Sequence, residues 1–282
     1  MTNNQAFKRM KQMMELRGIA ASTQKTYLMH LRQFTNHFST PFSDMSYDHV
    51  RDFLHHAISI RKLSCEYVKS CYSAIRFLYE TVFERDWNMK HIPRIKKKRK
   101  FPEVLSKEEI LKIINSLDNL KHKAMLVTAY SAGLRVSDVA NLKIADVDSN
   151  NMQLFIRQSK GNKDRYALLS KVNLSILRRY YKEFKPKEWL FPGQNPSLPI
   201  SSRTIQHVFN DAKNRAAIHK KVTPHTLRHS FATHLIEQGA NLLTVKELMG
   251  DDSIETTIQY IHLARRDILG VTSPIDGGEF DV

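Results

Sequence analysis

The segment with the most evident chemical potential is Thr223-Pro224-His225-Thr226-Leu227-Arg228-His229. Thr223 suits a helix N-cap and Pro224 suits the first helical position, so we expect a helix to begin here. His225 then lies in the first turn, and Arg228 lies one turn later on the same face. Free backbone N–H groups and the positive end of the helix dipole favour a phosphate group at this end. By itself, a histidine followed three residues later by an arginine is more typical of a capped helix with incidental basic residues.

The same helix has the spacing of a metal site. His225 and His229 are separated by four positions, as two zinc ligands on one helical face often are. A metalloprotease helix needs a glutamate beside the first histidine, however, and position 226 is threonine. The two cysteines, Cys65 and Cys71, are too few for a disulfide framework or a cysteine-based zinc site. We therefore expect no metal, and we interpret both cysteines as small apolar residues of the core.

Three further segments contribute residues that can act on a phosphate. Arg135 follows a Gly-Leu step between two predicted helices, which holds its guanidinium at a fixed place. Lys160 lies at the tip of a predicted hairpin, from which a long cation can reach a neighbouring groove. Tyr260 lies near the end of the chain. A single tyrosine is nearly always a core or surface residue, so its significance depends on the residues that accompany it.

Together these segments resemble the tyrosine recombinases, also called phage-type integrases, and within them the compact Xer-like members. The resemblance covers essentially the whole chain, and its motifs follow the family's order with ordinary spacing. The motifs are the Gly-Leu-Arg-x-Ser-Asp corner, the Ser-Lys-Gly-Asn-Lys-Asp-Arg hairpin, the His-Thr-Leu-Arg-His-Ser-Phe-Ala-Thr-His-Leu helix, a Leu-Met-Gly turn and Thr-Thr-x-x-Tyr. Several separated matches in order are far more specific than any one of them.

The resemblance implies an enzyme that cleaves and rejoins DNA strands through a 3′-phosphotyrosyl intermediate. Arg135 and Arg228 would clamp the scissile phosphate, because planar guanidinium groups fit phosphate oxygens bidentately. Tyr260 would be the nucleophile. Lys160 would protonate the departing 5′ oxygen, and His225 would help to move the tyrosine proton. No metal, ATP or other cofactor is expected, because side chains supply the cations and the phosphotyrosine conserves the bond energy.

Two acidic positions complete the expected site. Asp138 matches an acidic support position of the family and would orient the basic residues. Asp251 departs from the family pattern, because the residue after the Leu-Met-Gly turn is usually a histidine or tryptophan that donates a hydrogen bond to the phosphate. An ionised carboxylate offers only acceptors and a repulsive charge. Asp251 has three interpretations: a natural variant with another donor nearby, a deliberately weakened mutant, or a member that binds DNA but cuts poorly. We favour retained but weakened cleavage.

The fold class that we predict is mainly α, in two domains joined by a basic linker. Residues 1–92 are expected to form a helical bundle, which the resemblance identifies as a SAM-like core-binding domain that contacts DNA. Residues 93–103 form the basic linker, bounded by prolines. Residues 104–266 are expected to form a mostly helical catalytic domain with a small antiparallel three-stranded sheet, the DNA breaking-rejoining fold. Residues 267–282 form an acidic tail, for which docking on a neighbouring subunit is an option.

Apolar periodicity and capping signals predict the elements within these domains. Ser22 or Thr23 can cap a helix with apolar Tyr27, Leu31, Phe34 and Phe38, and Ser64 can open another with Val68, Tyr72, Ile75 and Tyr79. A further stripe consists of Val50, Phe53, Leu54 and Ala57. A capping box spans Ser106 to Glu109, with Leu105 and Ile110 as its hydrophobic staple. Strands are predicted at 143–147, 152–158 and 165–169, and later helices at 173–184, 202–217, 224–238, 242–249 and 254–262.

Charge indicates the class of partner. The chain carries 44 Lys and Arg against 28 Asp and Glu, a net charge of +16. Such an excess favours a polyanion, because each neutralised phosphate releases counterions. Net charge is +5 for residues 1–92, +5 for 93–103, +10 for 104–266 and −4 for 267–282, which suits a clamp around a duplex. The linker cations expected to contact DNA are Lys96, Lys97, Lys98, Arg99 and Lys100.

The expected partner is double-stranded DNA with paired half-sites, on which family relatives assemble as a homo-tetramer. No apolar run approaches the ~20 residues of a membrane span, and the N-terminus lacks the apolar region of a secretory signal, so we expect a cytoplasmic protein. Two alternatives to a recombinase are a derived protein that binds DNA without cutting it, kept open by Asp251, and a topoisomerase that also uses a tyrosine. The Xer-like pattern of the N-terminal helices argues against the topoisomerase. The sequence does not reveal the DNA target.

Overall fold

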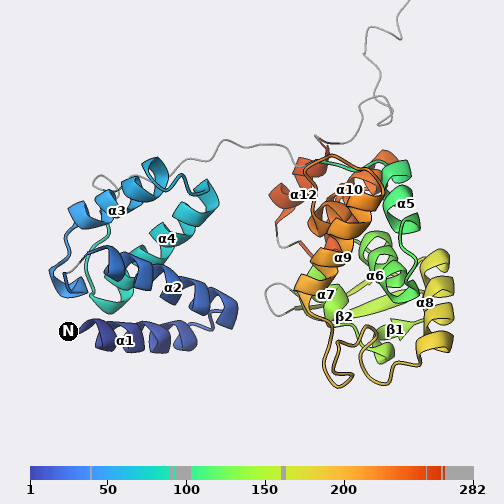
Figure 1. Cartoon of the computed structure of the whole chain (residues 1–282), viewed down its shortest axis with the longest axis horizontal. Helices are drawn as coiled ribbons and strands as arrows, with labels where there is room; N and C mark the ends of the chain where they lie inside the picture. Colours follow the sequence, from blue (N-terminus) through green and yellow to red (C-terminus); the bar gives the residue numbers. More distant parts are fainter. Residues whose placement is uncertain are drawn as a thin grey trace, which may run out of the picture. The chain divides into compact units, whose positions relative to one another are not determined.

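The computed structural model describes residues 1–38, 40–88, 92, 103–159, 163–251, 253–261 and 263. The chain divides into two compact units, Met1–Arg99 and Lys100–Val282 (Figure 1). Each unit has its own hydrophobic core. The cations Lys96 to Lys100, Lys160 and the acidic tail lie outside the described residues. None of the helices in the described ranges is long and apolar enough to cross a membrane.

The first unit is helical, as predicted. Its helices are α1 (Asn3–Leu16), α2 (Ala21–His37), α3 (Tyr47–Ser59) and α4 (Cys65–Phe77), and α4 continues into a π-helical turn at Leu78–Val82. Leu31 and Phe34 of α2 are buried with the predicted stripes of α3 and α4 in one core. Ser64 caps α4, since its hydroxyl accepts a hydrogen bond from the Tyr67 N–H at 3.2 Å.

Two predictions for this unit are corrected. Neither Ser22 nor Thr23 caps α2, because the helix begins at Ala21 and its N-cap, Ala20, makes no side-chain hydrogen bond. Both residues therefore lie in the first turn. Cys71 is a buried free thiol, as expected, and burial raises its pKa to about 12. Cys65 is only half-buried, so it is not a full member of the core.

The second unit combines helices with a small sheet, one face of which is buried. The elements that precede and form the sheet are α5 (Lys107–Asn115), α6 (Leu120–Ser131), α7 (Val136–Ala140), β1 (Val147–Asp148), β2 (Gln153–Ser159) and β3 (Lys163–Leu168). The elements that follow it are α8 (Lys171–Phe184), α9 (Ser202–Arg215), α10 (Pro224–Glu237), α11 (Leu242–Met249) and α12 (Ile254–Ile261). The three strands pair antiparallel in the order β1-β2-β3. This is the mainly helical domain with a small sheet that the sequence predicted.

The capping box at the start of α5 forms as expected. The Ser106 N–H donates to the Glu109 carboxylate at 2.8 Å, and the Glu109 N–H donates to the Ser106 hydroxyl at 3.2 Å. Leu105 and Ile110, the predicted staple, are fully buried in the same core. These contacts satisfy the backbone donors that a helix start leaves free.

The first predicted strand is largely wrong. Ile144–Asp146 forms a 3₁₀ turn, and only Val147 and Asp148 pair with β2. The cause is the buried carboxylate of Asp146, which accepts the Lys143 N–H at 2.9 Å and also binds Arg157 at 2.7 Å. A local side-chain acceptor of this kind favours a turn over an extended ladder.

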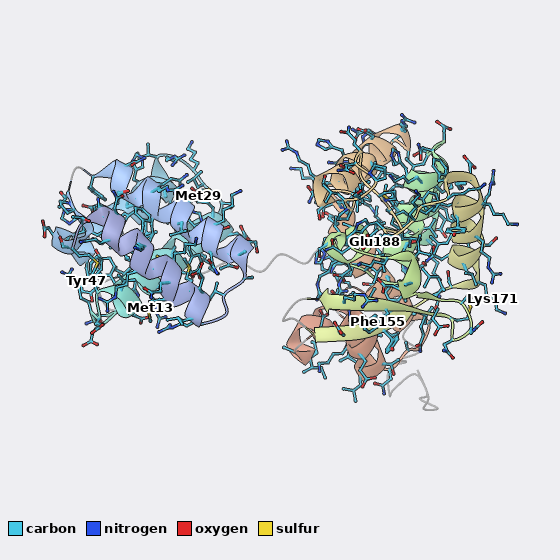
Figure 2. The ribbon with its side chains drawn as sticks, turned by 90° about the horizontal axis from the view of Figure 1, so that it is seen from below. Met13, Met29, Tyr47, Phe155, Lys171 and Glu188 are labelled. Carbon is cyan, nitrogen blue, oxygen red and sulfur yellow. The ribbon has the colours of Figure 1, made fainter. Side chains whose placement is uncertain are left out.

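The register of β2 against β3 directs alternate side chains to the core. Leu154 and Ile156 are buried, whereas Phe155 lies on the other face and packs on Tyr166 with ring centroids 5.2 Å apart. Figure 2 shows Phe155 on this strand and Lys171 at the start of α8. Ile156 pairs with Arg165, which fixes the position of that arginine in β3. The predicted hairpin is therefore present in its two strands.

Helix α10 is the most deeply packed helix around the predicted site residues. It packs against α6, α9, α11 and α12 (Figure 1). Its buried residues are Pro224, Thr226, Leu227, Arg228, Ser230, Phe231, Ala232, Thr233, His234 and Ile236. A helix buried on most of its faces belongs to the interior of a domain. Side chains that α10 carries are therefore held by several neighbouring elements at once.

Candidate active site

The N-terminal turn of α10 brings the predicted His225 and Arg228 into the site. Pro224 occupies the first helical position, and the Thr226 hydroxyl accepts a hydrogen bond from the Thr223 N–H at 3.1 Å. His225 is exposed, whereas Arg228 is only 1% exposed. The predicted helix start is thus present, and His225 and Arg228 differ sharply in burial.

Arg228 joins three segments that are distant in sequence. Its Nη1 donates to the carbonyl oxygen of Gly133 at 2.6 Å, and its Nη2 donates to that of Met249. Gly133 belongs to the corner between α6 and α7, and Met249 is the last residue of α11. These carbonyl groups orient the guanidinium and compensate for the loss of its hydration.

The Gly-Leu-Arg corner places Arg135 beside Arg228. Gly133 has φ +58°, and a Cβ atom there would lie 2.4 Å from the ring of Phe231. This corner therefore requires glycine for both its conformation and its space. Arg135 follows at the N-cap of α7, and its Nη2 donates to the Gly250 carbonyl oxygen at 3.4 Å. Its side chain is 18% exposed, so it remains open to solvent.

Asp251 lies between the two arginines. One of its oxygens, Oδ1, accepts from Nη2 of Arg228 at 2.9 Å and from Nη2 of Arg135 at 3.2 Å. The carboxylate is 7% exposed, and its Oδ2 is buried with no hydrogen-bond partner among the described residues. The expectation of a purely repulsive charge is therefore incomplete. In the DNA-free chain this carboxylate neutralises the pair of cations expected to bind the phosphate.

Asp138 supports the same corner through Arg165. Asp138 accepts the backbone N–H of Arg135 at 3.3 Å and Nη2 of Arg165 at 3.0 Å. Arg165 also donates through Nη1 to the Leu248 carbonyl oxygen at 2.6 Å. A Cβ atom at Gly250 would lie 2.3 Å from Cδ of Arg165, so this arginine lies directly against the Leu-Met-Gly turn.

Arg165 has no predicted role, although it is the last residue of the hairpin motif. Its side chain is 9% exposed and that of Asp138 is 4% exposed. Removing one partner of such a buried ion pair strongly destabilises the fold. The available signal was the alternation of side chains along the strand, which directs Arg165 toward the core, where a charged side chain needs a partner.

Tyr260 enters the site from α12 and contacts a second residue without an assigned role. The Tyr260 side chain is 2% exposed, and its Oη lies 3.1 Å from Nδ1 of His229. The ring of His229 also lies against that of His225, with centroids 4.5 Å apart. The one role that the spacing suggested for His229 was that of a metal ligand, which Thr226 argues against. The available signal was its spacing, because a residue four positions after His225 lies on the same helical face as His225 and Arg228.

The electrostatics of the site favour neutral histidines beside charged arginines. Desolvation, followed by the charge of Arg135, lowers the pKa of Arg228 to about 10, so it stays protonated at neutral pH. Desolvation, then His225 and Arg228, lowers the pKa of His229 to about 4. Desolvation, then Arg228 and Arg135, lowers the pKa of His225, and Asp251 opposes that shift. Both imidazoles are therefore mainly uncharged at neutral pH.

This arrangement suits transfer of a phosphoryl group to a tyrosine. Two guanidinium groups can bind phosphate oxygens, and a phenolic hydroxyl lies against a neutral imidazole. Within the described ranges, no group of three or more His, Cys, Asp or Glu side chains could hold a metal ion. The predicted Lys160 lies outside the described residues, so its place in this site stays a prediction.

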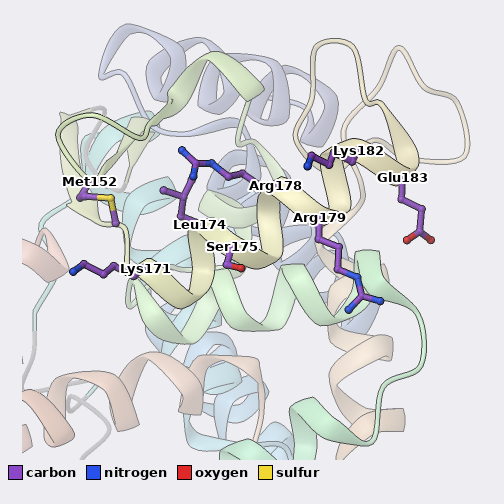
Figure 3. A pocket seen from close by; sticks show the side chains of 8 residues that line it. All are labelled: Met152, Lys171, Leu174, Ser175, Arg178, Arg179, Lys182 and Glu183. Carbon is purple, nitrogen blue, oxygen red and sulfur yellow. The ribbon is translucent and has the colours of Figure 1, made fainter.

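A separate basic hollow lies over α8 (Figure 3), a helix on the side of the second unit opposite α12 (Figure 1). Its volume is about 700 Å³. The residues that line it are Met152, Lys171, Leu174, Ser175, Arg178, Arg179, Lys182 and Glu183. It contains none of the residues predicted to carry chemistry.

Comparison with known proteins identifies similar chains. The model described as "Phage integrase family" matches residues 103–266, and the one described as "Phage integrase, N-terminal SAM-like domain" matches residues 7–89. A putative integrase/recombinase of Sinorhizobium fredii is 36% identical over 269 residues, which cover 95% of this chain and 87% of that protein. The tyrosine recombinase XerA of Pyrococcus horikoshii is 32% identical over 252 residues, which cover 88% of this chain and 85% of that protein.

Solved structures show the same fold. A crystal structure of XerA recombinase is 25% identical with a TM-score of 0.54, covering 94% of this chain and 95% of that chain. A lambda integrase tetramer bound to a Holliday junction has a TM-score of 0.74 at 21% identity, covering 97% of this chain and 80% of that chain. The predicted fold class, a SAM-like domain followed by a mostly helical domain with a three-stranded antiparallel sheet, is confirmed.

Proposed function

Because the chain belongs to the tyrosine recombinase, or phage integrase, family, we propose that it is an active site-specific DNA recombinase. It cleaves and rejoins strands through a 3′-phosphotyrosyl intermediate, without metal or ATP. One observation carries this proposal: α10 links a buried arginine, a second arginine and a tyrosine hydroxyl that contacts a neutral histidine. These groups supply the charge and the nucleophile that phosphoryl transfer requires.

The reaction assigns one task to each side chain. Arg135 and Arg228 bind the non-bridging oxygens of the scissile phosphate. Tyr260 attacks phosphorus, the bond to the 5′ oxygen breaks, and Lys160 gives that oxygen a proton. His225 assists the movement of the tyrosine proton. A phenol with a pKa near ~10 is a tolerable leaving group, so an incoming 5′ hydroxyl can reverse the step on a new strand.

The proposed substrate is double-stranded DNA with paired half-sites. Solved structures of relatives include XerH bound to its difH substrate and lambda integrase as a dimer on a core site and as a tetramer on a Holliday junction. By analogy, residues 1–92 and 104–266 bind one half-site together, and the cations of residues 93–103 contact the phosphates between them. A homo-tetramer then forms on two sites, and the acidic tail of one subunit docks on the next. The net charge of +16 supports a polyanionic partner.

The decisive experiment is the substitution Tyr260→Phe. We expect it to abolish detergent-resistant protein–DNA adducts while DNA affinity stays nearly unchanged, because one hydroxyl is lost and no phosphate contact is removed. The chain first selects its half-site from a random duplex library. A nicked form of that half-site, from which the cleaved fragment diffuses away, then traps the adduct on a denaturing gel. An adduct formed by the Phe variant would identify another nucleophile.

A protein that occupies DNA without cleaving it is the second candidate. The contact of Asp251 with both arginines favours it, because the carboxylate occupies donors that a phosphate needs. The same nicked half-site separates the two candidates. An adduct with the wild-type chain supports the recombinase, whereas full occupancy of the DNA with no adduct over many hours supports the binding protein.

A further inference from the structure

We propose that His229 is an additional catalytic residue, which accepts the hydroxyl proton of Tyr260 as this tyrosine attacks the phosphate. The proposal rests on the proposed function and deepens it. It gives the direct contact with the nucleophile to a histidine other than the one that the motif comparison singled out.

The geometry of α10 and α12 carries this assignment. Nδ1 of His229 lies 3.1 Å from Oη of Tyr260, within the distance required of a general base. Tyr260 is 2% exposed, so bulk water has little access to its hydroxyl. The two ring centroids are 5.5 Å apart, which holds the imidazole beside the phenol. An acceptor inside the protein is therefore needed where the proton leaves.

The charges around His229 keep it in the form that can accept a proton. Desolvation and the neighbouring His225 and Arg228 lower its pKa to about 4, so the ring is neutral at neutral pH. With its proton on Nε2, it presents a lone pair on Nδ1 to the tyrosine hydroxyl. A DNA phosphate bound at the arginines brings negative charge, which raises the pKa of His229. The substrate thus strengthens the base that it needs.

Each proton has a donor and an acceptor in both cleavage and rejoining. As the bond from Oη of Tyr260 to phosphorus forms, the hydroxyl proton moves to Nδ1 of His229. The bond from phosphorus to the 5′ oxygen breaks, and that oxygen receives a proton from the acid assigned to Lys160. In rejoining, a 5′ hydroxyl attacks phosphorus and gives its proton back to Lys160, while His229 returns its proton to the departing Oη. His225 lies against the ring of His229 and supports it from the exposed side.

The test compares His229→Asn with the wild-type chain. An asparagine amide keeps a polar group near the tyrosine hydroxyl and can accept its hydrogen bond, but it cannot take a proton. We expect single-turnover adduct formation on the nicked half-site to slow by about 10²–10⁴ at equal DNA occupancy, the range for general acid–base catalysis. A rate within about threefold of wild type would overturn the proposal, because orientation of Tyr260 would then suffice.

A second substrate separates base from acid. The nicked half-site is made with sulfur in place of the scissile 5′ oxygen, because a thiolate leaves without a proton. We expect His229→Asn to stay slow on this substrate, whereas Lys160→Ala recovers. Recovery of His229→Asn would instead assign His229 to the leaving group and overturn the proposal.

Two further outcomes are decided by the same assay. If the Asn side chain disturbs α10 and weakens DNA binding, His229→Gln supplies the second amide for the same comparison. If the wild-type chain forms no adduct on either substrate, the proposed function fails and the role of His229 fails with it. If wild type forms the adduct and only the expected slowing is missing, the proposed function stands and the role of His229 alone is overturned.

Discussion

Asp251 serves as an internal counter-ion for two arginines. A single oxygen of its carboxylate accepts from both Arg135 and Arg228, and Arg228 is 1% exposed. Removing one partner of a buried ion pair is strongly destabilising, so this carboxylate stabilises the DNA-free chain. Under the proposed function, a phosphate that binds the two arginines must compete with this carboxylate for the same donors. We therefore expect Asp251 to favour the DNA-free state and to oppose substrate binding.

We predict that Asp251→His raises the rate of phosphotyrosine formation. A histidine removes the competing charge and adds a donor, and one oxyanion donor is typically worth about 10²–10³ in rate. Asp251→Asn is the matched control, because it removes the charge while keeping the shape, and its rate should lie between those of aspartate and histidine. Single-turnover cleavage at equal occupancy measures both. Equal or slower cleavage by both variants would show that Asp251 does not compete with the phosphate.

The lowered pKa of His229 predicts how the free energy of unfolding depends on pH. Its pKa is about 4 in the folded chain and about 6.5 in an unfolded chain, so the folded state binds fewer protons between these values. The stability associated with neutral His229 is fully present above about pH 6.5 and is lost as pH falls toward 4. We expect His229→Asn to flatten the decline of the unfolding free energy between pH 6.5 and 4. Denaturant titrations at several pH values measure this slope, and parallel curves for the two proteins would contradict the prediction.

At the level of elements, Arg228 connects α10 to two other segments that build the site. Its guanidinium binds the carbonyl oxygens of Gly133 and Met249, at the end of α6 and the end of α11. Gly133 in turn allows the α6–α7 corner to lie against Phe231 of α10. The site therefore depends on close packing between helices as much as on the side chains that react.

We predict that Gly133→Ala damages the site beyond its conformational cost. A non-glycine residue at positive φ costs about 1–2 kcal/mol, and overpacking adds typically 1–3 kcal/mol. Gly239→Ala is the control, since Gly239 has φ +85° and a Cβ atom added there would have no neighbour within 4 Å. We expect both variants to lose stability, but only Gly133→Ala to slow cleavage strongly. Unfolding and single-turnover rates measure the two effects, and equal losses of activity would refute the proposed packing role.

Most of the fold followed from local signals in the sequence. The apolar stripes, the Ser106 capping box and the start of α10 were predictable because each depends on residues within one or two turns. The strand predicted at 143–147 failed for a reason that the apolar pattern does not contain. The Asp146 carboxylate accepts the Lys143 N–H and so favours a turn, and Arg157, eleven positions later, binds that carboxylate.

The site was predictable in its motif residues and not in their contacts. Arg135, Arg228 and Tyr260 were singled out because their motifs occur together, and their catalytic roles stay predictions. Arg165 and His229 had no assigned role, because their partners lie far along the chain. Arg165 binds the Leu248 carbonyl 83 residues later, and His229 contacts Tyr260 31 residues later. Such pairs become visible only when the elements are packed.

For the whole molecule, we expect the distribution of positive charge to set the affinity for DNA. The short segment 93–103 carries as much net charge, +5, as residues 1–92. The second unit carries another cationic cluster on α8, where Arg178, Arg179 and Lys182 are exposed. Figure 1 shows α8 on the opposite side of this unit from α12, which carries Tyr260. A duplex bound at Tyr260 therefore lies away from the α8 cluster.

This contrast gives a matched test of the linker. We predict that replacing Lys96, Lys97 and Lys98 by glutamine makes the salt dependence of DNA binding shallower, because each lost phosphate contact removes roughly 0.9 from the log–log slope. The full loss of three contacts would lower the slope by about 2.7. Replacing Arg178, Arg179 and Lys182 by glutamine changes the net charge equally and should leave the slope almost unchanged. Fluorescence anisotropy of a labelled half-site at several salt concentrations measures both. Equal slopes for the linker variant and the wild-type chain would mean that the linker only tethers the two units. Equal decreases of the slope in both variants would mean that total charge, rather than its position, determines affinity.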